Sequence, residues 1–201
     1  MKIKSKADNI VILFVEGATD ELFYKRLIET LRKEKGEKIK HNVQVIIENL
    51  KGIGQYKNKL SRIIKNKIKR DHRNCRCCAI LCYDTDVFEF SSKPPLILGN
   101  IVKELKKDGV DEVKFIKASH SIEDWFLIDS DGVLNFLNLP ADKNKVDRTR
   151  GLKEIERLFK KANRVYVKGL KCNGFIECLD MRKILSYISQ DIKAIYEELL
   201  E

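Results

Sequence analysis

The chain alternates between short apolar runs and longer stretches in which apolar residues recur every three or four positions. The runs are rich in β-branched residues and predict buried strands, whereas the helical spacing between them predicts amphipathic helices. The predicted strands are 9–16, 43–47, 78–83 and 113–116. The predicted helices are one from Thr19 to about Gly36, and then 56–70, 96–107 and 122–128. This alternation predicts an α/β fold with a Rossmann-like parallel sheet and helices on both faces.

The pattern changes after Pro140. A polar, charged stretch at 142–150 predicts a loop or linker. Beyond it, the periodicity predicts a helix at 151–162, a short strand at 165–167 and a second helix at 181–200. We therefore expect an α/β domain over residues 1–139 and a mainly helical extension over residues 140–201, packed on the same domain.

The net charge of the chain indicates the kind of partner that it binds. Of the 201 residues, 40 are Lys or Arg and 30 are Asp or Glu, so the formal net charge is +10. A basic balance favours polyanions, because neutralising phosphates releases condensed counterions. It predicts nucleic acid, DNA or RNA, as a partner, and a Lys-rich composition bias of the source genome is the alternative.

Hydrophobic patterning bears on location. No run of about eighteen uncharged apolar residues occurs, so no membrane span is predicted. The basic start at 1–6 is followed by an apolar run that carries Glu16 and Asp20 and lacks a small-residue cleavage site, unlike a signal peptide. We therefore expect a cytoplasmic location and no membrane partner.

Six cysteines are present, and four of them lie between Cys75 and Cys82. Without a secretion signal, disulfides are not expected. His72 before Cys75, Cys77 and Cys78 hints at zinc, but structural zinc sites usually combine two pairs of the C-x-x-C kind. Because Cys78 and Cys82 fall within an apolar strand, core thiols are the favoured interpretation.

Acidic residues end two of the predicted strands. Glu16 ends the first strand, and Asp84 and Asp86 end the third. Parallel strands bring their carboxyl ends to one edge of the sheet, where sites gather, and two carboxylates at this spacing share a side if the chain stays extended. Adjacent carboxylates repel each other without a cation. Since hard oxygen ligands suit small divalent ions, this edge predicts Mg²⁺ or Mn²⁺, with Asp20 facing the same pocket.

Two segments resemble the Toprim domain, which is found in topoisomerases, primases and OLD-family nucleases. They are Val15-Glu16-Gly17-Ala18-Thr19-Asp20-Glu21 and Tyr83-Asp84-Thr85-Asp86. The first is most similar to OLD-type, defence-associated nucleases. A third segment, 119–127, carries Glu123 and Trp125 and resembles an element that follows the fourth strand in RloB-like proteins. The resemblance covers about residues 9–130 and implies that residues 1–139 form a Toprim-like catalytic domain.

Carried over residue by residue, the resemblance implies roles for five carboxylates. Glu16 would be a metal ligand or a general acid–base group, and Asp84 and Asp86 would bind metal. Asp20 and Glu123 would then be secondary carboxylates that complete a second metal position. Two metal ions could activate water and stabilise the leaving oxygen in phosphodiester cleavage.

Basic residues near these acids are candidates for phosphate binding. Lys117 and His120 lie near the end of the fourth strand, and Lys168 follows the predicted late strand. Lys57 and Lys65, on a predicted Lys-rich helix, would hold backbone phosphates without sequence preference. A role as cap of the following helix is the alternative for His120, and a solvated helix face is the alternative for the two helix lysines.

The sequence therefore favours a metal-dependent nuclease that acts on DNA or RNA, and the resemblance suggests defence against mobile elements. The alternatives are a non-catalytic or partner-dependent nucleic-acid-binding module and a nucleotidyl-transfer enzyme that uses the same metal site. No ATPase P-loop is present, so an ATPase or other protein partner would act in trans. The sequence departs from many Toprim proteins after Asp86, where Glu89 is the only acidic residue nearby. Trp125 is expected in the core.

Overall fold

The computed structural model describes residues 8–86 and 97–201. Within them, parallel strands form one sheet in the order β2-β1-β3-β4. The strands are β1 (Asn9–Val15), β2 (Val43–Asn49), β3 (Arg76–Asp84) and β4 (Glu112–Ala118). The helices are α1 (Ala18–Lys35), α2 (Tyr56–Ile63), α3 (Lys69–Asp71), α5 (Leu98–Lys107), α6 (Ile122–Phe126), α7 (Ser130–Leu137), α8 (Gly151–Lys161), α9 (Met181–Ile188) and α10 (Lys193–Leu199).

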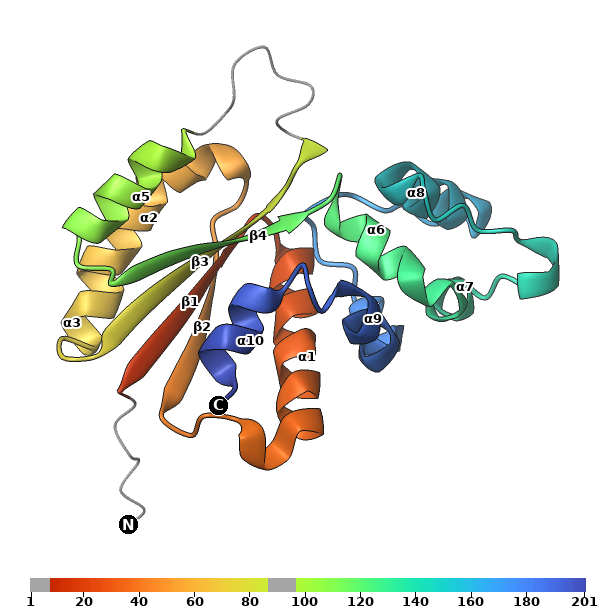
Figure 1. Cartoon of the computed structure of the whole chain (residues 1–201). Helices are drawn as coiled ribbons and strands as arrows, with labels where there is room; N and C mark the ends of the chain where they lie inside the picture. The colour runs from red at the N-terminus through yellow and green to blue at the C-terminus, as the bar shows by residue number, and fades with distance from the viewer. Residues whose placement is uncertain (1–7, 87–96) are drawn as a thin grey trace.

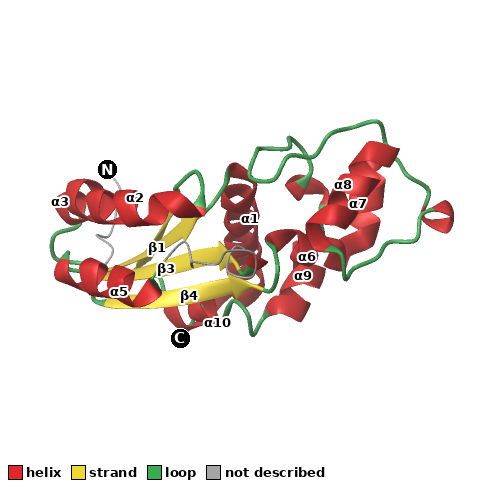
Figure 2. Cartoon of the chain, turned by 90° about the horizontal axis from the view of Figure 1, so that it is seen from above, coloured by secondary structure: helices red, strands yellow, loops and turns green. Residues whose placement is uncertain are grey.

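Helices cover both faces of the sheet, with α1 and α10 on one side and α2 and α5 on the other (Figures 1 and 2). Alternate residues of β1 enter the two layers: Val11 and Leu13 join the core under α1, whereas Ile10 and Ile12 join the core under α2 and α5. A parallel sheet buried on both faces requires such continuous apolar strands. The predicted α/β class is confirmed, and the arrangement is consistent with a Toprim-like or Rossmann-like fold.

The order of the strands creates a crevice between β1 and β3. The chain passes from β1 through α1 to β2 at one edge, and α2 then carries it back past β1 to β3. Such a reversal leaves an opening at the carboxyl ends of the two central strands, where ligands bind in open α/β sheets. Glu16 and Asp84 stand at these two ends.

Residues 140–201 share their core with the first part of the chain. Phe126 of α6 and Phe159 of α8 both pack on Phe175, with ring centroids 5.6 and 5.3 Å away. Phe126 also lies 5.4 Å from Phe23 of α1, so the aromatic stack continues the core on the α1 side of the sheet. The boundary that we placed after residue 139 stays a prediction.

The strand predicted at 165–167 is wrong. These residues have no strand assignment in the described chain and belong to a loop that spans 163–174. Val165 and Val167 are 82 % and 49 % exposed, whereas Tyr166 between them is buried. The alternation therefore marks a loop that inserts one side chain into the core.

The helix predicted at 181–200 is two helices. The chain turns after Ile188 and buries Ile192 completely before α10 begins. The other predicted helices and strands are present with shifted ends, although Leu96, the predicted start of α5, and Glu89 lie outside the described residues. In the part of the chain that the structure describes, no helix is both long and apolar enough to cross a membrane.

The predictions for Trp125 and the strand cysteines are confirmed. Trp125 is 5 % exposed and packs 5.9 Å from Phe23, centroid to centroid. Cys78 and Cys82 are buried in β3, and all six cysteines are free thiols.

Candidate active site

Three carboxylates line one groove of about 600 Å³ at the crevice between β1 and β3. Glu16 follows β1, Asp20 lies in the first turn of α1, and Asp84 ends β3. Glu16 Oε1 accepts a hydrogen bond of 3.1 Å from the Asp84 N–H. Asp20 Oδ2 accepts one of 2.8 Å from the Gly17 N–H, the bond by which an acid in the third helical position reaches back to the N-cap. A sequence-local turn thus holds Asp20, whereas Glu16 is held by the end of a strand 68 residues away in the sequence.

Two turns joined by hydrogen bonds position Asp84 and Asp86. Asp84 Oδ1 accepts a hydrogen bond of 2.9 Å from the Ile122 N–H, at the start of α6. The Asp86 N–H donates to the His120 carbonyl at 3.0 Å, and the His120 N–H donates to Thr85 Oγ1 at 2.8 Å. His120 has φ of 63°, a left-handed conformation that His adopts more readily than most residues.

Lys168 brings a positive charge to these acids. Its Nζ lies 2.7 Å from Asp84 Oδ2 and 2.9 Å from Asp86 Oδ2. The loop that carries Lys168 is bonded to the start of α1, where the Ala18 N–H donates to the Gly169 carbonyl at 2.9 Å. The loop is thereby fixed over the carboxyl end of the sheet.

Two glycines allow that close approach. A Cβ added at Gly17 would lie 2.6 Å from Gly169 Cα, which is far inside van der Waals contact. Gly169 itself has φ of 78°, which favours glycine. The position of Lys168 therefore depends on glycine at both places.

Glu123 is a further buried acid beside the groove. It is 1 % exposed, and its Oε1 accepts a hydrogen bond of 2.8 Å from the Tyr166 hydroxyl. Its Oε2 is buried without a hydrogen-bond partner among the described residues. An unsatisfied carboxylate oxygen is costly, and one explanation for it is a ligand that the bound state supplies.

Burial raises the pKa of three of these acids. The pKa of Glu16 rises to about 7 because its charged form loses water, although the Asp84 N–H opposes the rise and the charge of Asp20 adds to it. For Asp20 the pKa rises to about 6 through burial, opposed by the Gly17 N–H and increased by the charge of Glu123. Burial likewise raises the pKa of Asp84 to about 8, even though Lys168 lowers it.

The cluster fits a divalent metal ion. In the described chain Lys168 forms ion pairs with Asp84 and Asp86, and its charge also acts on three further carboxylates, namely Glu16, Asp20 and Glu123. Negative charge is therefore incompletely balanced, and the oxygen of Glu123 described above has no donor. Hard oxygen donors of this kind suit Mg²⁺ or Mn²⁺.

Other predicted residues do not join this cluster. Lys117 is exposed on β4, and because its neighbours Ile116 and Ala118 enter the core under α1, its side chain points to the opposite side of the sheet from that core. Lys57 and Lys65 are exposed on the outside of α2 and of the π-helical turn that follows it.

His120 reaches the site through its backbone. The N-cap of α6 is Ser121, so the alternative in which His120 caps that helix is wrong.

Sequence reasoning missed two tyrosines that support the site. The Tyr56 hydroxyl lies 3.1 Å from the Phe14 carbonyl and also bonds to the Cys82 carbonyl, which ties the ends of β1 and β3 together. Tyr166 supports Glu123. Both were indistinguishable from ordinary apolar positions in the sequence. The only local signal for the loop was the Lys168-Gly169 pair, in which glycine follows a basic residue.

Comparisons with known proteins add little. No family model matches the chain, and no curated protein matches it. The chain is similar to a solved structure of the C-terminal region of the OLD protein of Xanthomonas campestris pv. campestris, with 13 % identity and a TM-score of 0.39, over 95 % of this chain and 100 % of that one. At this identity and TM-score the likeness carries no inference about fold or activity.

Proposed function

We propose that the chain is a divalent-metal-dependent nuclease that cleaves phosphodiester bonds of DNA or RNA. The observation that carries the proposal is the convergence of buried and half-buried carboxylates on one lysine at the switch point of the sheet. Carboxylates alone would repel a phosphodiester, so their concentration there suits a cation between protein and substrate. Bound Mg²⁺ or Mn²⁺ would help to activate water and to stabilise the leaving oxygen.

The chain's own groups divide the remaining work. Glu16 Oε1 is occupied by the Asp84 N–H, which leaves Oε2 free to take a proton from an attacking water. Asp84 and Asp86 are placed to hold the cation, because both present an oxygen to the same positive charge now. Lys168, whose side chain is 33 % exposed, would turn to the phosphate oxygens once a metal ion takes over its carboxylate partners.

One observation favours a second candidate, the non-catalytic nucleic-acid-binding module. Lys168 already pairs with both Asp84 and Asp86, and a site whose charges are paired internally could serve as a scaffold without turnover. In that case the phosphates would bind to basic side chains elsewhere and the carboxylates would hold the loop in place.

The deciding experiment compares wild type, Glu16→Gln and the control Glu29→Gln. Gln at position 16 can still accept the bond from the Asp84 N–H, so it removes charge and basicity while keeping the contact. Glu29 is an exposed residue of α1, outside the carboxylate cluster. Each protein is incubated with single- and double-stranded DNA and RNA, in Mg²⁺ or Mn²⁺ and in EDTA. We expect metal-dependent cleavage that falls about 100-fold or more in Glu16→Gln and is unchanged in Glu29→Gln.

Three results would count against the nuclease. Cleavage that survives both Glu16→Gln and EDTA would point to a contaminant or to another site. Nucleic-acid binding without cleavage by the wild type would favour the binding module. Cleavage or transfer that requires a nucleoside triphosphate would instead favour nucleotidyl transfer.

A further inference from the structure

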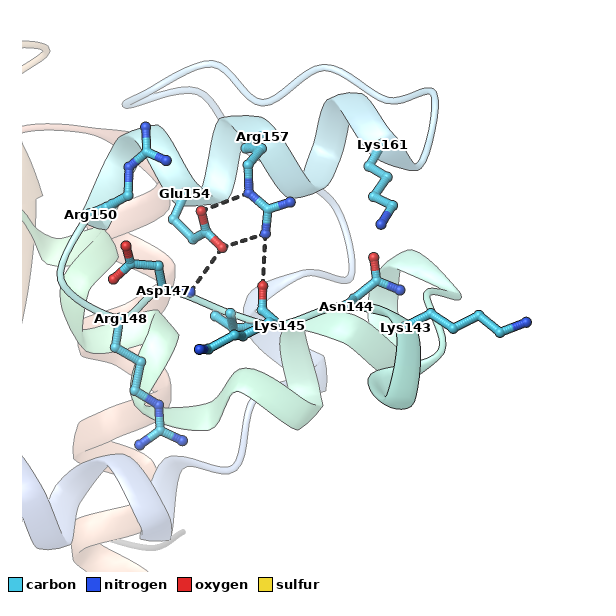
Figure 3. A pocket seen from close by; sticks show the side chains of 10 residues that line it. Lys143, Asn144, Lys145, Asp147, Arg148, Arg150, Glu154, Arg157 and Lys161 are labelled. Atoms are coloured by element: carbon cyan, nitrogen blue, oxygen red, sulfur yellow. Dashed lines mark hydrogen bonds and ion pairs between the residues drawn. The ribbon is translucent and has the colours of Figure 1, made fainter.

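A second charged site lies between the loop that ends at Arg150 and helix α8 (Figure 3). It is a pocket of about 810 Å³, and we call it the 143–161 basic pocket. Among the residues that line it, Asp147 and Glu154 are acidic, and six are basic: Lys143, Lys145, Arg148, Arg150, Arg157 and Lys161. The pocket is therefore strongly positive.

Both acids of the pocket are committed to holding its shape. Glu154 is 1 % exposed, and its Oε1 accepts hydrogen bonds from the Asp147 N–H at 3.0 Å and from Arg157 Nη2 at 2.6 Å. Arg157 also donates to the Lys145 carbonyl at 3.0 Å, and Asp147 Oδ1 accepts from the Thr149 hydroxyl at 2.6 Å. These bonds, most of them drawn in Figure 3, brace the loop against α8.

Four of the cations remain available. Lys143, Lys145, Arg150 and Lys161 are exposed, and within the described chain none of these side chains makes a hydrogen bond or an ion pair. A braced loop that keeps several unpaired cations near one another creates a positive potential that favours a bound polyanion.

The pocket begins next to the carboxylate site. Gly151, the first residue of α8, packs so closely on α6 that an added Cβ would lie 2.7 Å from Asp124 Oδ1. Asp124 is in the first turn of α6, two residues after Ile122, whose N–H binds Asp84. Arg150 is thus the pocket residue at the site end of α8, and Lys161 is at the far end (Figure 3).

We propose that the 143–161 basic pocket holds the phosphate backbone of the nucleic-acid strand whose scissile bond lies at the carboxylate site. The proposal rests on the proposed nuclease function and extends it to a path for the substrate. Cations spread along a loop and a helix suit the repeated charges of a backbone. None of the described residues that line the pocket is aromatic, so it lacks a platform for stacked bases, and the contact is independent of sequence.

The test compares two variants that each lose two lysines and one arginine. The pocket variant is K143Q/K145Q/R150Q, and the control is R32Q/K33Q/K35Q, in the last turn of α1, on residues that we assign to no site. All six side chains are exposed, and thermal unfolding checks that both variants remain folded. Binding of labelled DNA and RNA oligonucleotides is followed by fluorescence anisotropy in EDTA, over a series of salt concentrations, so that no cleavage interferes.

We expect the pocket variant to bind about tenfold or more weakly and its slope of log K against log salt to fall by about 2 on single strands and about 3 on duplex DNA, because three phosphate contacts are lost. The control should stay within about twofold of wild type. Equal losses in the two variants would overturn the proposal, since net charge alone would then explain binding. Unchanged affinity of the pocket variant, or no binding by wild type, would also overturn it.

Because the assay needs no turnover, its outcome is separate from that of the nuclease. If the wild type binds through the pocket but never cleaves, the proposed phosphate-binding role of the pocket stands and the proposed nuclease function is wrong. If the wild type cleaves and the pocket variant binds and cleaves equally well, the nuclease function stands and the role of the pocket is wrong.

Discussion

Strand β3 has a cluster of charged residues at each end, and the two clusters differ in how their charge is balanced. At the carboxyl end, the buried Asp84 and the half-buried Asp86 share one lysine, Lys168. At the amino end, Glu198 of α10 lies between two cations, 2.6 Å from Arg76 Nη1 and 2.7 Å from Lys114 Nζ. Acidic and basic residues therefore balance each other at the amino end of β3, whereas the acids outnumber their cation at the carboxyl end.

The pKa values express this difference. Burial pushes the pKa of Glu198 upward, but the bonds from Arg76 and Lys114 outweigh burial and lower it to about 2. At the other end burial prevails, and the pKa of Glu16 rises to about 7. A group that prefers its charged form in the folded state stabilises the fold, whereas one that resists charging costs stability. Such a cost is common at functional sites.

Ligand spacing alone would favour a metal ion at the amino end, because among the described residues the carboxylates at the carboxyl end do not form a group of three with ligand atoms within 4.8 Å of one another. Cys78, Glu112 and Glu198 place possible metal-ligand atoms within 4.8 Å of one another. Burial, however, raises the pKa of the Cys78 thiol, and Arg76 and Lys114 already neutralise Glu198. We therefore assign no metal ion to the amino end of β3, and its charge balance marks it as a structural ion-pair network.

The largest predicted effect comes from Glu198→Gln. The change removes the buried anion that Arg76 and Lys114 share and leaves them the partly exposed Glu112 as a common partner. We expect a loss of about 2–3 kcal/mol in the free energy of unfolding, less than for a fully buried pair because Arg76 is partly solvated and Glu112 still pairs with both cations. The measurement is urea unfolding at about pH 7. Glu197→Gln, whose exposed side chain pairs with the same Lys114, should cost much less, because water screens an exposed ion pair.

The dependence on pH sharpens this prediction. Since the folded pKa of Glu198 is about 2 and the ordinary value is 4.5, its contribution is complete above pH 4.5 and is lost as the pH falls toward 2. The difference between wild type and Glu198→Gln should therefore shrink in acid. A difference that persisted at about pH 2 would show that the ion pairs are not its origin.

The next prediction is that Glu16→Gln stabilises the metal-free protein by about 1–2 kcal/mol at about pH 7. The unfolded chain loses the Glu16 proton above about pH 4.5, whereas the folded chain keeps it to about pH 7, so stability falls as the pH rises through this range. Glutamine removes that cost. Unfolding in EDTA at about pH 4 and 7 checks this, because the gain should vanish at the lower pH. A destabilised variant with Glu29→Gln unchanged would mean that the Glu16 charge supports the fold.

The sequence could predict those features of the two clusters that depend on local pattern. Apolar runs that end on Glu16 and Asp84 indicate both the parallel sheet and its acidic edge, because side-chain periodicity and strand polarity are local properties. Lys168 was a candidate for phosphate binding, but its pairing with these acids was not predictable, since it lies 82 residues from Asp86 and is placed by a contact between two glycines. Glu198, 122 residues from Arg76, shows the same limit.

The smallest predicted effect is the rise in melting temperature when metal is added, and this measurement decides which end of β3 binds metal. A ligand at about five times its dissociation constant stabilises the folded state by about 1 kcal/mol, which raises the melting temperature of a chain of this length by about 2–4 °C. We expect Mg²⁺ or Mn²⁺ to produce this shift in the wild type and in Glu198→Gln. In Glu16→Gln we expect no shift. If the shift instead persisted in Glu16→Gln and disappeared in Glu198→Gln, the metal would lie beside Cys78 and Glu112, and the functional and structural assignments of the two clusters would have to be exchanged.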